Sequence, residues 1–376
     1  MHRIPFQLTI IVLISILLLP GCQRGGNKGG DVSGSLSAEN CLERLKEIGA
    51  TLEYHANGNL KSINLVGIDV DDATLNGLGQ FKTLETVTIA SHDKPNDRVT
   101  NAAIAQLSGI TTLKSLDLCG AAVTSDVLPQ LHNMKALSQL KMSGKLSGDG
   151  TKVLGSQFPA LTSIAFDRSD IGDSDLAEIA KVKKLTGLFL AHTNITDQGM
   201  PQLANLTNLT NMRLSNTAVT DEGIKPLVSL KALVRLDLSS TDVGDNTLAT
   251  LESMTQLERL NLYVTKVTDA GVDSLLSLVN LNWLNLDACR IGDISIPKLA
   301  MLKKLTFLHL GSTDISDDCI ETLKTMPYIK ELHVTRTNVT RQGAESLLAA
   351  LPQDCIVVVD KVVDKVVDEQ ATDAVQ

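Results

Sequence analysis

The chain has 376 residues, of which 43% are apolar although only ten are aromatic, namely one Trp, three Tyr and six Phe. Large compact cores normally hold more aromatic side chains, so this composition favours a stack of small repeated units. The net charge of −9 excludes the broad cationic surface that a nucleic acid needs. The six Cys form no Cys-x-x-Cys pair and no Cys/His cluster, so we predict no metal and no cofactor.

The first 22 residues have the organisation of an export signal. Arg3 precedes an apolar run from Leu8 to Leu19, after which the composition turns abruptly to Gly, Ser and charged residues. The run has twelve residues, fewer than the ~18 to 20 that span a bilayer, so an uncleaved transmembrane helix is the less favoured alternative. Residues 23–37 contain five Gly and three Ser, which predicts a flexible tether.

The end of this segment resembles the lipobox of bacterial lipoproteins. Its residues are Leu19, Pro20, Gly21 and Cys22, and the resemblance implies that Cys22 becomes the lipid-bearing N-terminus of the mature protein. Pro20 departs from the motif, which usually has a small or hydroxyl-bearing residue there. We therefore expect an exported protein of the bacterial cell envelope, held at a membrane by a lipid on Cys22 or by the signal itself.

From Leu60 onward the sequence repeats with a period of 24 residues. Eleven rows have 24 residues, and the row that begins at Leu84 has 29. The rows begin at Leu60, Leu84, Leu113, Leu137, Leu161, Leu185, Leu209, Leu233, Leu257, Leu281, Leu305 and Ile329. A single row cannot bury its apolar face, whereas stacked rows bury it continuously, so the sequence predicts a solenoid over residues 60–352.

Each row, numbered from its first residue as position 1, has a strand half and a helix half. Apolar residues at positions 4 and 6 predict a short strand with these two side chains inward and positions 3, 5 and 7 outward. Apolar residues at positions 16, 19 and 22 have helical spacing. Between the halves, pairs such as Thr196-Asp197 and Thr220-Asp221 are expected to cap the first turn of the helix.

This pattern resembles the leucine-rich repeat, in a bacterial 24-residue form with Thr-x-Val-Thr-Asp-x-Gly-Leu in each row. The resemblance covers Leu60 to Pro352. It implies an α/β solenoid, a horseshoe or arc of about 12 repeats with a parallel sheet on the concave face and short helices or 3-10 turns on the convex face. It also implies that Thr at position 9, as in Thr193 and Thr217, replaces the usual Asn and satisfies backbone groups between rows. Members of this family are mostly binding scaffolds.

The ends of the stack need covering. Residues 38–59 combine apolar residues at helical spacing with a strand and the turn pair Asn57-Gly58, which predicts an N-terminal cap of a helix and a hairpin. Within residues 353–376, the apolar segment from Cys355 to Val359 is expected to close the sheet. The charged tail that follows is interpreted as a frayed end rather than a partner-binding helix. In the long row, the extra residues 92–98 are expected to form an insertion.

The outward positions change character along the chain. Early rows offer small side chains such as Ser62 and Thr86, whereas later rows carry Arg, His and aromatic residues, including the only Trp. Because Arg and aromatic side chains dominate interface energetics, we predict a ligand-binding site on the concave face. The predicted site residues are Phe189, Arg213, Arg235, Arg259, Tyr263, Trp283, Phe307, His309 and His333.

A surface that satisfies its own interactions is the alternative. Arg213 and Asp237 occupy the same position in adjacent rows and can pair across strands, and Trp283 can stack on Phe307 in the same way. Such a surface ladder would exist without any ligand.

No catalytic motif is present. The sequence has no Gly-x-Ser-x-Gly, His-Glu-x-x-His, Gly-rich phosphate loop or Cys-His pair, so we predict that the protein is not an enzyme. The predicted function is a protein-binding scaffold of the cell envelope. The alternatives are a structural or self-associating envelope lipoprotein, and an adhesin for a protein or glycan of a host or neighbouring cell. Aromatic stacking suits a sugar ring, but nothing selects a glycan over a protein.

Overall fold

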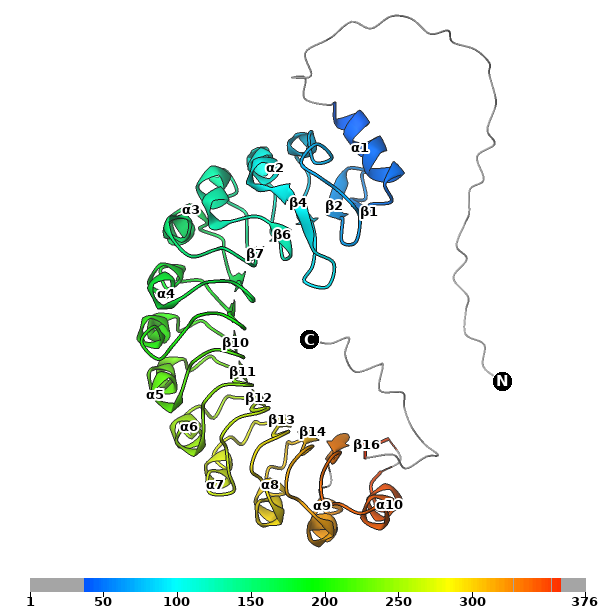
Figure 1. The fold of residues 1–376 in the computed structure, drawn as a ribbon, viewed down its shortest axis with the longest axis vertical. Helices are drawn as coiled ribbons and strands as arrows, with labels where there is room; N and C mark the ends of the chain where they lie inside the picture. The colour runs from blue at the N-terminus through cyan, green and yellow to red at the C-terminus, as the bar shows by residue number, and fades with distance from the viewer. Residues whose placement is uncertain (1–36, 327, 353, 360–376) are drawn as a thin grey trace, which may run out of the picture. The chain divides into compact units, whose positions relative to one another are not determined.

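The structure is a computed structural model that describes residues 37–326, 328–352 and 354–359. In this part of the chain the rows stack side by side along an arc, with strands on the inner side and helices on the outer side (Figure 1). The expected fold class, an α/β solenoid with a parallel sheet on its concave face, is confirmed. The predicted export signal with Cys22, residues 23–36 of the tether and residues 360–376 of the tail lie outside the described residues.

Fourteen strands of the described chain form one sheet, whose order follows the sequence. The strands are β1 (Thr51–Tyr54), β2 (Leu60–Asn64), β3 (Thr86–Thr88), β5 (Ser115–Asp117), β7 (Gln139–Lys141), β8 (Ser163–Ala165), β9 (Gly187–Phe189), β10 (Asn211–Arg213), β11 (Arg235–Asp237), β12 (Arg259–Asn261), β13 (Trp283–Asn285), β14 (Phe307–His309), β15 (Glu331–His333) and β16 (Ile356–Val358). β1 and β2 pair antiparallel as a hairpin, and the later neighbours pair in parallel. Equivalent positions of successive rows are therefore side by side, as Trp283 and Phe307 are.

Short helices and 3-10 turns follow the strands on the outer side of the arc (Figure 1). The α-helices are α1 (Ala38–Glu47), α2 (Asn101–Ala105), α3 (Leu154–Gln157), α4 (Asp173–Ile179), α5 (Asp221–Ile224), α6 (Asp245–Leu251), α7 (Val272–Leu275), α8 (Ile296–Leu299), α9 (Ile320–Leu323) and α10 (Arg341–Ala350). The 3-10 turns are η1 (Leu78–Gln80), η2 (Gln106–Gly109), η3 (Ser125–Leu131), η4 (Asp149–Val153), η5 (Met200–Asn205), η6 (Lys225–Ser229), η7 (Asp293–Ser295) and η8 (Asp317–Cys319).

The core lies between the sheet and the helices and is built from the repeated apolar positions. Positions 1, 4 and 6 are buried in all twelve rows, as Leu281, Leu284 and Leu286 illustrate. Each buried leucine stabilises the stack by roughly 1.5–3 kcal/mol relative to an exposed one. The inward half of the predicted alternation is therefore confirmed throughout the solenoid.

The chain leaves most strands of the rows through a left-handed residue at position 8. Gly120 and Gly144 occupy this position in early rows, and eight later residues have φ between 51° and 56° there although they are not glycine. These residues are Arg168, His192, Asn216, Ser240, Val264, Ala288, Ser312 and Arg336. This backbone costs about 1–2 kcal/mol for a residue with a Cβ. It aims the amide at the next row, where Val264 N donates to the Asp287 carbonyl at 2.9 Å, so the ladder continues beyond the strand.

The threonines at position 9 act within their own row, which corrects the expectation that they bridge rows. Thr193 Oγ1 donates to the Leu190 carbonyl at 2.7 Å, and Thr217 Oγ1 donates to the Leu214 carbonyl at the same distance. The acceptor is the residue three positions earlier, because the left-handed turn folds the chain back over the end of its own strand. These hydroxyls therefore close the turn of one row.

The aspartates at position 13 bridge the rows instead. In the expected capping pairs only the hydroxyl caps its own helix, as when Thr220 Oγ1 accepts from Glu222 N. The carboxylate reaches the following row: Asp245 accepts from Thr268 N at 2.8 Å and from Thr268 Oγ1 at 2.7 Å. A Cβ added at Gly271 would lie 2.5 Å from Asp245 Oδ1, which explains the glycine at position 15. An aspartate ladder thus ties successive rows together.

The two ends and the insertion are attached to this stack. At the N-terminal end, α1 buries Cys41 and Leu45 against the first rows. In the long row, β4 (Asn96–Thr100) pairs with β6 (Ala121–Ala122) in a small second sheet. Arg98 of the insertion contacts Asp69 at 2.6 Å, which ties it to the preceding row. At the other end, β16 adds in parallel to β15.

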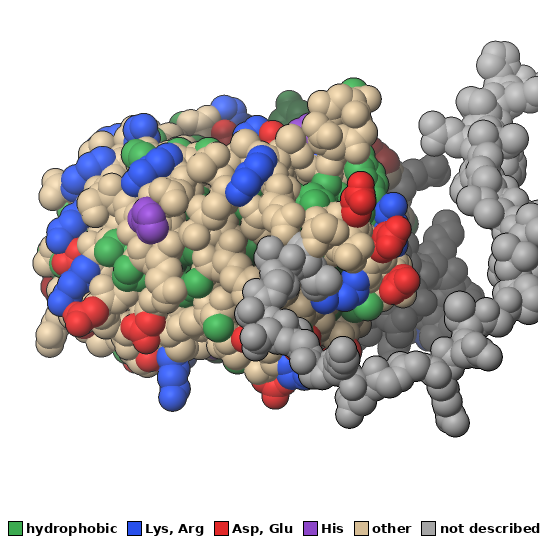
Figure 2. Space-filling view, turned by 90° about the horizontal axis from the view of Figure 1, so that it is seen from above, with side chains coloured by type: hydrophobic (Ala, Val, Ile, Leu, Met, Phe, Trp, Pro, Cys, Tyr) green, Lys and Arg blue, Asp and Glu red, His purple; other side chains and the backbone are tan. Residues whose placement is uncertain are grey.

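The molecular surface is mixed in charge. Figure 2 shows one end of the solenoid with Lys, Arg, Asp and Glu side chains scattered among polar surface, and hydrophobic side chains only as small separate patches. No helix among the described residues is long and apolar enough to cross a membrane.

Candidate functional site

The concave sheet presents three lines of residues, at row positions 3, 5 and 7. In the strands of the later rows, positions 3 and 5 are partly or fully exposed while position 4 is buried, as predicted. Position 7 departs from the prediction, because Ser215, Ser239 and Asp287 are buried there. The strand has already ended, and the left-handed turn at position 8 draws position 7 inward. Among the described residues at this position only Tyr263 is exposed rather than buried or half-buried, with 41% of its surface accessible.

A continuous stack of side chains runs along position 3 of three adjacent strands. The guanidinium of Arg259 lies 4.8 Å from the centre of the Trp283 ring, and the Trp283 and Phe307 rings are parallel with centroids 4.6 Å apart. In-register parallel pairing places the three side chains one strand apart, which permits this contact. We call Arg259, Trp283 and Phe307 the aromatic stack. The stacking foreseen for a self-satisfied surface is therefore present.

Two histidines extend the stack at position 5. His309 and His333 stack with centroids 4.4 Å apart, and Phe307 lies 5.4 Å from the His333 ring. His333 Nε2 lies 2.7 Å from Glu331 Oε1. The structure therefore brings five of the predicted site residues, Arg259, Trp283, Phe307, His309 and His333, into one connected cluster.

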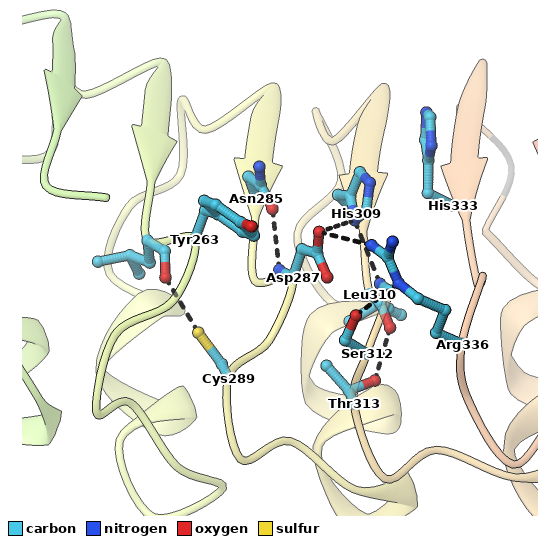
Figure 3. Close-up of polar contacts among 12 residues, drawn as sticks. Tyr263, Asn285, Asp287, Cys289, His309, Leu310, Ser312, Thr313, His333 and Arg336 are labelled. Carbon is cyan, nitrogen blue, oxygen red and sulfur yellow. Dashed lines mark hydrogen bonds and ion pairs between the residues drawn. The ribbon is translucent and has the colours of Figure 1, made fainter. Parts of the chain in front are cut away.

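A buried carboxylate lies beneath these rings. Asp287 is only 6% exposed, and its Oδ2 lies 3.4 Å from an Arg336 nitrogen and 3.9 Å from His309 Nδ1 (Figure 3). Its Oδ1 has no hydrogen-bond partner within the described chain. His309 Nδ1 accepts from Gly311 N at 3.2 Å. Burial and the neighbouring His333 lower the pKa of His309 to about 4, so this ring is neutral at pH 7.

The remaining predicted residues lie in rows on the N-terminal side of Trp283. Arg213 binds Asp167, two rows away, and stands 5.3 Å from the centre of the Phe189 ring. The alternative pairing of Arg213 with Asp237 is not formed in the described chain, where Asp237 Oδ1 instead accepts from Ser239 Oγ and Ser239 N in its own row. Arg235 is exposed and, within the described chain, has no ion pair or hydrogen bond through its side chain.

Arg336 was missed by the sequence reasoning. It occupies position 8, which belongs to none of the three outward lines, yet its left-handed backbone brings the side chain over Asp287 and Ser312. A signal was available, because the same position is Gly120 and Gly144 in the early rows and glycine there indicates a positive φ.

The sequence matches no family model and no curated protein. The structure is similar to an internalin of Listeria monocytogenes, with a TM-score of 0.58 and 21% identity over 87% of this chain and 90% of that one. Internalin C2 of the same organism matches with a TM-score of 0.41 and 27% identity, over 50% of this chain and 84% of the other. The plant peptide hormone receptor RGFR1, in complex with RGF2, matches with a TM-score of 0.43 and 12% identity, over 77% and 56%.

The likeness to the first internalin concerns the fold and extends over nearly the whole of both chains. Together with the twelve rows, the concave parallel sheet and the convex helices, it identifies the architecture. The described chain has the leucine-rich repeat fold and is structurally similar to an internalin of Listeria monocytogenes.

Proposed function

We propose that the protein is a non-catalytic scaffold that binds another protein through the C-terminal half of its concave face. The observation that carries this proposal is the run of large side chains over the adjacent strands β12, β13 and β14, at positions that the fold does not use for packing. Aromatic and Arg side chains contribute most of the binding energy in protein interfaces.

The stacking of these side chains on one another is compatible with a binding site and favours it. Trp283 and Phe307 remain partly exposed in the stack, and Tyr263 and Val264, which follow the strand of the preceding row, are 41% and 43% exposed. Stacked rings are held in one orientation before a partner arrives, so less side-chain entropy is lost on association. The cluster therefore combines exposed apolar area with a fixed shape.

The titratable groups favour a binding role over catalysis. Burial raises the pKa of the thiol in all five described cysteines, Cys41, Cys119, Cys289, Cys319 and Cys355, so none is a ready thiolate nucleophile. The low pKa of His309 keeps its ring neutral, and its Nδ1 is occupied by the Gly311 amide.

Capture from an envelope extract tests the proposal. The bait is the chain from Ser37 onward, beside a Trp283→Ala, Phe307→Ala double variant and a matched control, Gln139→Ala with Ser163→Ala, at position 3 of early rows. We expect a partner that the control retains and the aromatic variant loses. A partner held equally by all three baits contradicts the proposal, as does recovery of the chain itself alone, which would support self-association.

We further propose that the protein is exported and anchored in the bacterial envelope through a lipid on Cys22. The support is the basic start, the apolar run and the lipobox-like Cys22 in the sequence. A Cys22→Ser variant should move from the membrane to the soluble fraction. Retention of that variant in the membrane after carbonate extraction would contradict a lipid anchor and support an uncleaved helix.

A further inference from the structure

We propose that Arg235 and Arg259 receive carboxylates of an acidic protein segment, whose neighbouring apolar side chains lie on Trp283 and Phe307. This inference rests on the proposed function and specifies the chemistry of the partner. Arg235 and Arg259 are directly opposite each other on β11 and β12, and we call them the arginine pair.

The arginine pair has no internal counter-charge. Within the described residues neither side chain makes an ion pair or a hydrogen bond, and the Arg259 guanidinium lies 4.8 Å from the centre of the Trp283 ring. Like charges directly opposite on neighbouring strands destabilise a sheet. By contrast, Arg213 on the preceding strand β10 binds the carboxylate of Asp167. Two adjacent uncompensated cations are therefore a feature of β11 and β12 that folding does not require.

The polar side chains at position 5 of the same two strands are engaged in hydrogen bonds within their own rows. Asp237, two residues after Arg235, accepts from Ser239 Oγ at 2.7 Å and from Ser239 N at 3.0 Å. Asn261, two residues after Arg259, accepts from Tyr263 N at 3.2 Å. Burial and the charge of Arg235 both lower the pKa of Arg259, which is consistent with repulsion between the two guanidinium groups. A carboxylate from a partner would offset this repulsion.

The surroundings select an acidic protein segment rather than a polyanion. The guanidinium fork matches a carboxylate, and the adjacent rings offer apolar area that a peptide side chain can cover. The whole chain has a net charge of −9, which repels a continuous phosphate backbone. A segment with a few carboxylates next to apolar residues complements both parts of this surface.

Peptide selection tests the inference. A random peptide library is displayed against the wild type, against Arg235→Gln with Arg259→Gln, and against a matched control, Arg290→Gln, an exposed arginine at position 10 outside the three outward lines. We expect Asp and Glu to be enriched for the wild type and the control, and this enrichment to disappear for the double variant. An individual selected peptide should lose roughly tenfold in affinity on the double variant.

Charge reversal sharpens the test. Arg235→Glu with Arg259→Glu should select peptides enriched in Lys and Arg, which a merely structural role for the pair does not produce. Peptides without acidic enrichment that still require Trp283 and Phe307 would overturn this inference and leave the proposed function standing. Peptides that bind independently of both the rings and the arginine pair would overturn both. Tighter binding of a sulfated glycan or DNA oligonucleotide through the arginine pair would overturn the assignment to a protein.

Discussion

The early and late rows share one interior and differ in the residues they present on the concave face. Position 4 is buried and apolar in both halves, as Leu140 in β7 and Leu284 in β13 show. At position 3, however, β7 has Gln139 where β13 has Trp283. The backbone and its packing are therefore indifferent to the change. The large side chains of the late rows are thus available for the binding role proposed above.

The two halves also differ in how their charges are balanced. In the early rows Lys141 at position 5 pairs with Asp117 on the neighbouring strand at 3.2 Å. In the late rows, within the described chain, the arginine pair has no such partner. Exposed pairs such as Lys141 and Asp117 contribute only ~0.2–1 kcal/mol, so the contrast concerns recognition more than stability.

The largest expected effect tests whether the interior is the same in both halves. Leu140→Ala and Leu284→Ala should each lower the free energy of unfolding by about 2–5 kcal/mol, because both remove a fully buried side chain. Denaturant melts of the two variants provide the measurement. A loss below about 1 kcal/mol in either would show that the row register is incorrect.

Next in size is removal of one rung of the aspartate ladder. Asp245→Ala leaves Thr268 N and Oγ1 without their acceptor, and we expect a loss of about 2–3 kcal/mol. Asp242→Ala is the control, because Asp242 makes an exposed ion pair with Lys266 and should cost under about 1 kcal/mol. Equal losses of stability in the two variants would show that the aspartate ladder does not stabilise the stack.

One pH-dependent contribution to stability should come from His309 in the late rows. His309 has a pKa of about 4 in the folded chain, below its ordinary value of 6.5. The unfolded chain therefore binds the proton first, and stability present above pH 6.5 is lost as the pH falls toward 4. We expect this histidine to account for about 1–2 kcal/mol of the loss, and His309→Phe to flatten the unfolding curve in that window. An unchanged pH profile in the variant would argue against a buried neutral ring.

The smallest expected effect separates binding from folding. Trp283→Ala with Phe307→Ala should lower stability by about 0.5–1.5 kcal/mol, the value of one aromatic pair. The early pair Thr86→Ala and Ser115→Ala should change it by less than about 0.5 kcal/mol. Thermal melts of the two purified double variants provide the measurement. A large fall in the melting temperature of the Trp283→Ala, Phe307→Ala variant would mean that the rings are needed for folding.

The repeated apolar positions predicted the fold, whereas the turn chemistry did not follow from them. A 24-residue period fixes which side chains lie side by side, so the stacking of Trp283 on Phe307 could be anticipated. The apolar period alone does not place a left-handed residue at position 8. At Ala288 that residue follows the buried Asp287, and at Arg336 it brings the side chain over Asp287. The contact of Arg213 with Asp167 spans two rows and depends on the conformation of the arginine side chain. The residue types at equivalent row positions do not predict that conformation.

The central claim is that the partner occupies the late half of the concave face, and the only Trp of the chain lies there. Its fluorescence can be followed while a Trp-free peptide selected on the domain is added to the wild type. The account predicts a saturable change in emission that the early-row control pair, Thr86→Ala with Ser115→Ala, leaves intact and that Arg235→Gln with Arg259→Gln weakens. Saturated binding by calorimetry without any change in Trp283 emission would place the partner elsewhere and contradict it.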